Sequence, residues 1–367
     1  MKIFVTGTRG IPDIPGGVEK HCQELFPRIA RSGHEVILAT RASYVTDRLD
    51  RWKGVKLVHL FAPRKKSLEA IIHTTLAVLT ARLHNPDILH INAIGPSLLV
   101  PLARLLGMKV VMTNHGPDYD RQKWGRLAKA MLRLGEKLGG LFANEVIVIS
   151  NVIADILRTR CGRESHLIYN GVPIPEPSTS TDYLEGIGAE TGRYVLAVVR
   201  FVPEKGITDL IQAFTGMDTE MKLVIAGDAD HETEYSRKIR QLARADSRII
   251  LTGYITGEPL HQVFSHARLF VLPSYHEGLP IALLEAMSYG LDVLVSDIPA
   301  NKEVGLAEDR YFICGNVEDL RCRMEHRLSR RMAEKDREAM RREVQQRYNW
   351  DDIAKQTIAV YERARKG

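Results

Sequence analysis

The feature that most constrains the fold is an alternation of short β-branched runs with helix-like segments along the whole chain. The runs form two series: Lys2–Thr6, Glu35–Thr40, Lys56–Leu60, Ile88–Ile91, Lys109–Thr113, Glu145–Ile149 and His166–Tyr169, then Tyr194–Val199, Lys222–Ala226, Ile249–Thr252, Leu269–Leu272 and Asp292–Val295. Strands that alternate with helices form parallel sheets covered on both faces. The sequence therefore predicts the α/β class, with two doubly wound, Rossmann-like domains facing across a cleft.

The domain boundaries follow from composition. Pro173–Thr181 is rich in Pro, Ser and Thr and is typical of a linker. We therefore expect domains at residues 1–172 and 191–349, joined by a linker at 173–190. One highly charged helix is predicted at about Val317–Tyr348, followed by a last helix at residues 350–367. A chain of 367 residues is long for one core and suits two domains.

Composition narrows the location of the protein but not its activity. The N-terminus reads as a strand and a Gly-rich loop rather than a signal peptide, and no apolar run approaches the ~18 residues that cross a bilayer. The four cysteines are scattered without metal-ligand spacing, which favours a cytoplasmic protein. A net charge of +6 favours anionic partners, such as sugar nucleotides or acidic lipid surfaces, without choosing between them.

The segment Ser274–Met287 carries the most chemical information. We expect a helix that has Pro280 in its first turn and ends before Gly290. The N–H groups of Gly278 and Leu279 would then form a seat for a phosphate. Glu277 and Glu285 would repel that phosphate unless they accept hydrogen bonds from sugar and ribose hydroxyls. The pattern favours a sugar-nucleotide site; the alternative is one loop glutamate and one solvated helix glutamate.

Other candidate residues of the second domain also follow strands, where ligands bind in open α/β sheets. Arg200 and Lys205 lie in a Pro/Gly-bounded loop that suits a diphosphate, although loop cations are usually only solvated. Further strand ends are expected to line the base and ribose pocket, with the residues Gly227, Asp228, Gly253 and Tyr254.

In the first domain, the loop after the first strand contains Gly16 and Gly17 ahead of a helix. It lacks the Gly-x-Gly-x-x-Gly fingerprint, which disfavours an NAD(P)-dependent oxidoreductase. His115 follows the fifth strand run, and Asn170 belongs to an Asn-Gly turn that could be a simple hinge. His90 and Asn92, at another strand end, are predicted to line the cleft.

These motifs resemble the retaining GT-B glycosyltransferases of family 4. The resemblance rests on Glu277 and Glu285 at the family's Glu-x7-Glu spacing, on the Arg-x-x-x-x-Lys-Gly pattern from Arg200, on the Gly-Gly loop, on His115 and on the Asn-Gly-Val turn at Asn170. The opening Gly7–Pro12 is most similar to bacterial rhamnosyl- and related hexosyltransferases of surface polysaccharides. Two departures, Val199 before Arg200 and Pro299–Lys302 in the last loop, bear on donor fit.

The resemblance implies the roles of the residues. His115 and Glu277 would contact the donor sugar, Glu285 the ribose, and Arg200 and Lys205 the diphosphate. Gly16, Gly17, Gly278 and Leu279 would offer backbone N–H groups to the donor. The last helix would cross back to the first domain.

The predicted activity is transfer of a hexosyl or deoxyhexosyl unit from a UDP-, GDP- or dTDP-sugar to a saccharide or lipid-linked saccharide. Alternatives are a GT-B sugar-nucleotide epimerase and a non-catalytic nucleotide-sugar-binding module. No metal, other cofactor or nucleic acid is expected. We therefore interpret the Asp-x-Asp sequences at Asp118 and Asp228 as turns.

One segment raises the question of membrane contact. Asp118–Phe142 places apolar residues at helical spacing (Trp124, Leu127, Met131, Leu134, Leu138 and Leu141) between basic ones (Arg121, Lys123, Arg126, Lys129, Arg133 and Lys137). Arg64–Lys66 repeats the basic pattern before another apolar helix. Such a helix can lie peripherally on an anionic membrane at the inner face of the cell. The alternative is an apolar stripe that faces the core.

Overall fold

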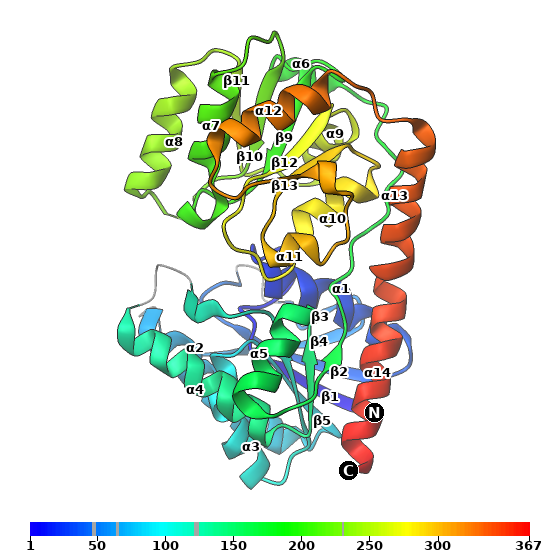
Figure 1. The fold of residues 1–367 in the computed structure, drawn as a ribbon. Helices are drawn as coiled ribbons and strands as arrows, with labels where there is room; N and C mark the ends of the chain where they lie inside the picture. Colours follow the sequence, from blue (N-terminus) through cyan, green and yellow to red (C-terminus); the bar gives the residue numbers. More distant parts are fainter. Residues whose placement is uncertain (46–48, 64–65, 121–124, 230) are drawn as a thin grey trace. The chain divides into compact units, whose positions relative to one another are not determined.

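A computed structural model describes residues 1–45, 49–63, 66–120, 125–229 and 231–367. These residues form two compact units (Figure 1). The first unit consists of Met1–Gly171 and Tyr348–Gly367, and the second of Val172–Arg347.

The first unit is built on an eight-stranded sheet in the order β3-β4-β2-β1-β5-β6-β7-β8. All neighbours are parallel except β3 and β4. The order reverses between β1 and β5, because the chain first adds strands on one side of β1 and then on the other. The strands are β1 (Lys2–Thr6), β2 (Glu35–Arg41), β3 (Arg51–Trp52), β4 (Val55–Leu60), β5 (Ile88–Asn92), β6 (Val110–Asn114), β7 (Glu145–Val148) and β8 (His166–Leu167).

Helices cover the buried strands of this sheet. They are α1 (Gly17–Arg31), α2 (Lys66–His84), η1 (Pro96–Leu99), α3 (Val100–Leu105), η2 (Asp118–Asp120), α4 (Arg126–Phe142), α5 (Asn151–Cys161) and the C-terminal α14 (Trp350–Lys366). Every residue of β5 and β6 is buried, as expected for a parallel sheet with helices on both faces.

The C-terminal helix α14 belongs to the core of the first unit. It packs against α1, and Trp350, Ile353 and Tyr361 join the same apolar cluster as strand residues such as Ile3. A Cβ on Gly171 would lie 2.6 Å from the Trp350 ring, so only glycine permits this approach.

The second unit has a six-stranded, all-parallel sheet in the order β11-β10-β9-β12-β13-β14. Its order reverses between β9 and β12. The strands are β9 (Tyr194–Val198), β10 (Lys222–Ala226), β11 (Ile249–Gly253), β12 (Leu269–Leu272), β13 (Val293–Ser296) and β14 (Tyr311–Phe312). Two doubly wound parallel sheets confirm the predicted fold class.

The helical elements of the second unit are α6 (Asp182–Gly186), η3 (Pro203–Lys205), α7 (Ile207–Thr215), α8 (Glu234–Arg244), α9 (Gly257–Ser265), α10 (Ile281–Ser288), α11 (Pro299–Lys302), η4 (Glu308–Arg310), α12 (Val317–Leu328) and α13 (Glu334–Arg347). The single charged helix predicted at Val317–Tyr348 is therefore wrong. The Arg268 guanidinium donates to the carbonyls of Arg327 and Leu328, which satisfies the last carbonyls of α12 where the helix ends.

Residues 173–190 are not a free linker. Within the second unit, Ser178 N donates to Ser265 Oγ at 2.8 Å and Tyr183 N donates to Gln262 Oε1 at 3.0 Å. Helix α6 also packs against α9. Polar side chains of α9 thus hold a segment whose composition suggested a loose connection.

Candidate functional site

The site in the second unit begins where its strand order reverses. Such a switch point leaves a crevice beyond the carboxyl ends of the two strands, because the following loops lead to opposite faces of the sheet. Here β9 leads to Arg200 and Lys205, and β12 leads to Glu277. The topology therefore brings together two segments that the sequence analysis had selected independently.

Lys205 and Glu277 are in direct contact. Lys205 Nζ lies 2.5 Å from Glu277 Oε1, and Ser274 Oγ donates to the same oxygen at 2.6 Å. The side chains of Lys205 and Glu277 are 19% and 9% exposed. Because both contacts fall on Oε1, Oε2 is the carboxylate oxygen better placed to accept a hydroxyl of a ligand.

Two backbone contacts join the loops that carry this pair. Tyr275 N donates to Glu204 O at 2.9 Å. Gly206 has φ +62, and a Cβ there would lie 2.1 Å from Pro273 O. The Tyr275 hydroxyl also hydrogen-bonds Asp209 on α7, and this contact, together with burial, raises the pKa of Tyr275. The two loops form one tightly packed structure.

A series of buried hydrogen bonds connects the Glu277 loop to the segment after β13. Asn301 Nδ2 donates to Ser296 Oγ at 3.1 Å, and Ser296 Oγ donates to Ser274 O at 2.5 Å. Ser274, Ser296 and Asn301 are all fully buried. Ser296 and Asn301 are not among the site residues predicted from the sequence.

Helix α10 begins one residue later than predicted. It starts at Ile281, and Pro280 is its N-cap residue with ψ +77. Gly278 and Leu279 therefore precede the helix, with Leu279 buried at 6% exposure. The positive end of the α10 dipole still faces this loop. Glu285 lies in the middle of α10 and is partly exposed. Burial and, to a smaller extent, the charge of Glu285 raise the pKa of Tyr289.

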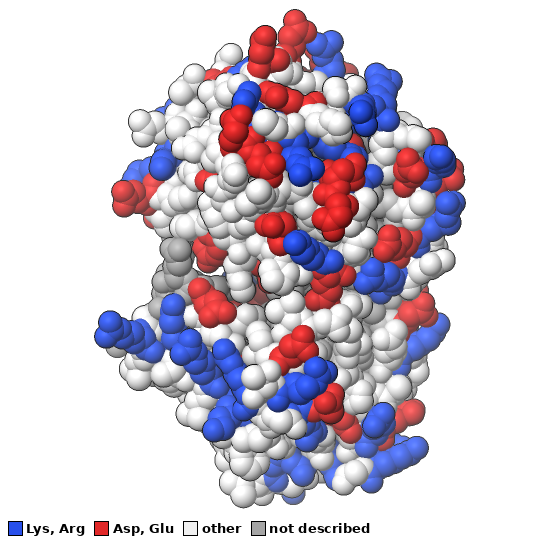
Figure 2. All heavy atoms as spheres, viewed as in Figure 1, with Lys and Arg blue, Asp and Glu red and all other residues white. Residues whose placement is uncertain are grey.

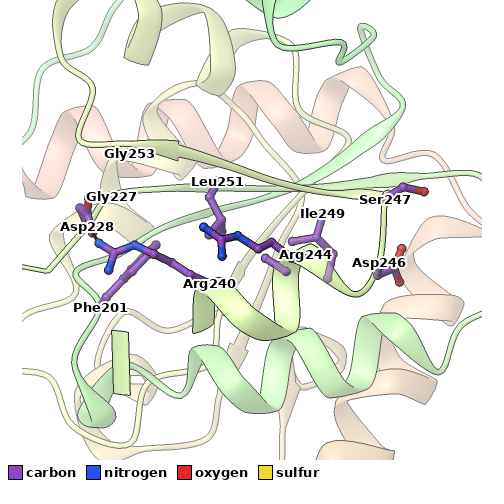
Figure 3. A pocket seen from close by; sticks show the side chains of 11 residues that line it. Phe201, Gly227, Asp228, Arg240, Arg244, Asp246, Ser247, Ile249, Leu251 and Gly253 are labelled. Carbon is purple, nitrogen blue, oxygen red and sulfur yellow. Dashed lines mark hydrogen bonds and ion pairs between the residues drawn. The ribbon is translucent and has the colours of Figure 1, made fainter. Parts of the chain in front are cut away.

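A pocket of about 540 Å³ lies between α8 and the edge strand β11 (Figure 3). Gly227, Asp228 and Gly253 line one end, and Asp246 and Ser247 line the other. Asp228 Oδ1 accepts from Arg240 Nη2 at 2.6 Å. Lys205, Glu277 and Glu285 do not line this pocket. Three residues predicted for the base pocket are thus gathered apart from the Lys205–Glu277 pair.

Two other predicted residues of the second unit, Arg200 and Tyr254, are exposed on its surface. Arg200 lies two residues beyond the end of β9. The next residue, Phe201, donates its N–H to Asp228 O at 3.0 Å. Tyr254 is 64% exposed. Gly227 has no room for a Cβ, which would lie 1.9 Å from Val199 O. The loops after β9 and β10 are therefore closely joined.

The first unit has its own switch point, between β1 and β5. A Cβ on Gly7 would lie 2.0 Å from Asn92 O, so the loop after β1 passes directly over the end of β5. Gly16, the N-cap of α1, has φ +146 and faces the Arg9–Glu19 ion pair. Gly17 has open space where a Cβ would stand, so its backbone is approachable.

His115 lies in a polar cluster of the first unit. Its Nε2 is 3.0 Å from Asn92 Oδ1. With that oxygen as acceptor, Nε2 carries the proton and Nδ1 remains an acceptor. The ring meets His21 edge-on, with centroids 4.7 Å apart, and His21 Nδ1 lies 2.6 Å from Asn170 Oδ1. Asn170 is thus more than a hinge turn, while sequence reasoning missed His21, which carries no distinctive spacing.

Burial keeps these rings neutral at physiological pH. Desolvation, followed by the charge of His21, lowers the pKa of His115 well below its ordinary value. Desolvation outweighs the Asn170 hydrogen bond and lowers the pKa of His21 to about 4. A neutral His115 is suited to accept a hydrogen bond from a sugar hydroxyl rather than to supply a positive charge.

His90 does not line a site. It is fully buried, with Nδ1 2.5 Å from the Tyr361 hydroxyl of α14 and Nε2 2.7 Å from Thr113 Oγ1. The prediction that it lines a cleft is therefore wrong, because α14 covers the face of β5 on which it lies.

Among the described residues, no group of three or more His, Cys, Asp and Glu side chains is arranged to hold a metal ion. Of the two Asp-x-Asp sequences, the first lies in η2, and Asp230 of the second lies outside the described residues.

Family models match both halves of the chain. The model described as "Glycosyltransferase Family 4" matches residues 15–175, and the model described as "Glycosyl transferases group 1" matches residues 184–347. An uncharacterized glycosyltransferase of Methanocaldococcus jannaschii is 25% identical, with 98% of each chain covered. The serotype-specific mannosyltransferase WbdA of Escherichia coli is 29% identical over 46% of this chain, a match that spans 22% of its own length.

Solved structures have the same fold. Sucrose-phosphate synthase from Thermosynechococcus elongatus superposes with a TM-score of 0.85 at 21% identity, and 98% of each chain is covered. Anabaena HepE, solved in complex with UDP and glucose, has a TM-score of 0.78 at 18% identity and the same coverage. At these identities the likeness concerns the fold.

Proposed function

Since the chain belongs to the family 4 type of glycosyltransferases, we propose that it moves a hexosyl or deoxyhexosyl unit from a nucleoside-diphosphate sugar to a saccharide or lipid-linked saccharide, with retention at the anomeric carbon. The observation that carries this proposal is the Lys205–Glu277 contact at the β9/β12 switch point, directly before the N-terminus of α10. A cation, a carboxylate and a helix N-terminus at one crevice suit a diphosphate bonded to a hydroxyl-rich sugar.

Each residue then has a chemical role. Lys205, Arg200 and the N–H groups at Gly278 and Leu279 stabilise the negative charge that grows on the leaving diphosphate, which is typically the largest catalytic effect. Glu277 accepts hydrogen bonds from hydroxyls of the donor sugar through Oε2, and Glu285 accepts hydrogen bonds from the ribose hydroxyls.

Separate roles are proposed for residues of the first unit. Neutral His115 accepts a hydrogen bond from a sugar hydroxyl at Nδ1. The backbone N–H groups of Gly16 and Gly17 are proposed to contact the donor. Gly227, Asp228, Gly253 and Tyr254 are proposed for the base and ribose.

In the bond-forming step, the acceptor hydroxyl oxygen attacks the anomeric carbon while the bond from that carbon to the diphosphate oxygen breaks. The leaving oxygen takes the proton of the acceptor. No protein nucleophile is needed on this front-face route. We further propose that protein cations replace a divalent metal, so transfer should be unchanged by EDTA.

The donor and the pathway are proposed from relatives. A UDP-linked donor is favoured by the UDP complexes of HepE, with GDP- and dTDP-sugars as alternatives. A role in surface polysaccharide synthesis is favoured by the similarity to the mannosyltransferase WbdA. A cytoplasmic location suits the four free thiols, Cys22, Cys161, Cys314 and Cys322.

The test is incubation of the protein with UDP-, GDP- and dTDP-sugars, with and without a lipid-linked acceptor. Transfer to the acceptor supports the proposal. Conversion of one sugar nucleotide into another without transfer would instead indicate an epimerase, and binding without turnover would indicate a non-catalytic module.

The site assignment is tested by Glu277→Ala and Lys205→Ala, with Glu232→Ala and Lys238→Ala as surface controls of equal charge change. Each site variant is expected to lower kcat at least about a hundredfold, because a preorganised group at the reacting centre is lost, while circular dichroism stays unchanged. Near-wild-type turnover in either site variant would refute the assignment.

A further inference from the structure

Helix α4 packs on the first unit through a face made of very small residues. Its buried residues are Gly135, Glu136, Gly139 and Gly140. A Cβ on Gly135 would lie 2.2 Å from Ile94 O, and one on Gly139 would lie 2.3 Å from Met112 Sδ. Glycine inside a helix costs about 1 kcal/mol relative to alanine, so these glycines indicate that close approach at this face matters.

Four large apolar residues of α4 lie on its outer side. Leu127 is 78% exposed, Leu134 is 47%, Leu141 is 46% and Phe142 is 48% exposed. The three leucines are seven residues apart and therefore lie along one side of the helix. A stripe that faces the core as a whole would bury these leucines, whereas only Met131 and Leu138 of the described part of the predicted stripe are partly buried. Trp124, Arg121 and Lys123 lie outside the described residues.

The charge beside this apolar stripe has one sign. Arg126, Arg133 and Lys137 are exposed on α4, and helical spacing places them along one edge of the leucines. The single carboxylate of the helix, Glu136, is buried and paired with Arg160 at 3.0 Å. Figure 2 shows Lys and Arg side chains gathered over this part of the first unit, beside an uncharged surface.

Helix α2 also exposes large apolar residues. Leu79 and Leu83 of α2 are 47% and 87% exposed, and α2 packs against η1, as α4 does. Soluble monomers rarely leave a large contiguous apolar patch uncovered unless it binds a partner. In the described part of the chain, no helix combines the length and apolar character that a bilayer crossing requires.

We propose that the outer face of α4, with the exposed end of α2, docks on an anionic lipid bilayer. The leucines would enter the acyl layer of such a bilayer, and the row of cations beside them would contact its negatively charged headgroups. A second copy of this face would bring the same cations opposite each other, which disfavours self-association. The inference goes beyond the proposed glycosyl transfer and does not depend on it.

The test is flotation of the full chain with vesicles of phosphatidylcholine and about 30% phosphatidylglycerol, without any donor or acceptor. Wild-type protein is expected to float, and to float less as salt rises from about 0.05 to about 0.5 M. The double variant R126E/K137E should bind about 25-fold more weakly or worse, since each basic residue near the surface contributes about fivefold.

Two matched controls separate the face from general charge and apolar character. K335E/R342E makes the same change in net charge on exposed residues of α13 and should bind like wild type. Leu127→Ser/Leu134→Ser should reduce flotation, whereas Ile313→Ser, at a residue 57% exposed in the second unit, should not.

Three outcomes would overturn the proposal. They are failure of the wild type to float, equal loss in the α13 control, and wild-type binding by R126E/K137E. Sedimentation that shows a wild-type dimer lost in that variant, without vesicle binding, would assign the face to a second copy instead. All substituted residues are exposed, so circular dichroism is expected to show folded variants.

Discussion

Replacing Gly206 by alanine tests whether the contact between the two loops of the second unit holds Lys205 against Glu277. Gly206 directly follows Lys205 and has φ +62, and its added Cβ would lie 2.1 Å from Pro273 O. The ordinary contact distance begins at 3.4 Å. One of the loops must therefore move by about 1.3 Å in the variant.

Two costs follow from this geometry. Alanine in the left-handed region costs about 1–2 kcal/mol, and the forced displacement adds about 1–3 kcal/mol, as for other overpacked sites. A misplacement of about 1 Å near reacting atoms lowers the rate roughly a hundredfold. We therefore expect G206A to lose about 2–5 kcal/mol of unfolding free energy and most of its turnover.

The measurement is urea unfolding together with release of nucleoside diphosphate from the active donor. Gly192→Ala is the matched control, because Gly192 has φ +70 but open space where its Cβ would stand. It should show the conformational cost alone and keep its turnover. If G206A resembles G192A in both stability and turnover, the loop contact does not position Lys205.

Two further variants probe buried polar groups. Asp292 is 3% exposed between Arg310 and Arg327, each 12% exposed. D292A should lower the unfolding free energy by about 3 kcal/mol, because two largely buried guanidinium groups lose this carboxylate and only Arg327 keeps a second one, that of Asp309. D352A, at the exposed pair with Lys355, should change it by less than about 1 kcal/mol. The pKa of His21 is about 4 in the folded state and 6.5 ordinarily, so the unfolded state binds the extra proton between these values. Stability of the first unit should therefore fall as pH drops from about 6.5 to about 4, by about 3 kcal/mol for this residue. His21→Asn should make that slope shallower in urea titrations, while His115 and His90, whose pKa values are also lowered by burial, retain their share; an unchanged slope would refute the assignment.

Much of the fold was predictable because its strands have strong local signals. The bounds of β1, β10 and β12 agree with the predicted runs, each of which is rich in branched or aromatic residues. The two-residue strands β3 and β14 were not predicted, since a pair of residues carries no periodicity. The break between α12 and α13 was also missed, because Arg268, far away in the sequence, satisfies the carbonyls where α12 ends.

The proximity of two candidate site residues was predictable, because both follow strands. Lys205 and Glu277 were identified in this way, and the structure places them 2.5 Å apart. Ser296 and Asn301 were not identified, because their contact with the Glu277 loop depends on the packing of β13. The His21–Asn170 contact joins residues 149 positions apart, and no local pattern indicates such a pair.

The membership of α14 in the first unit affects how this protein is made. Trp350, Ile353 and Tyr361 complete a core whose other members lie in the first half of the sequence. The residues of α14 are synthesised after the whole second unit. The first unit therefore leaves the ribosome with the place of α14 uncovered, and it finishes folding only after the second unit has been synthesised. Chains that stop before Tyr348 would keep this apolar surface open, and we expect them to be captured by chaperones or degraded.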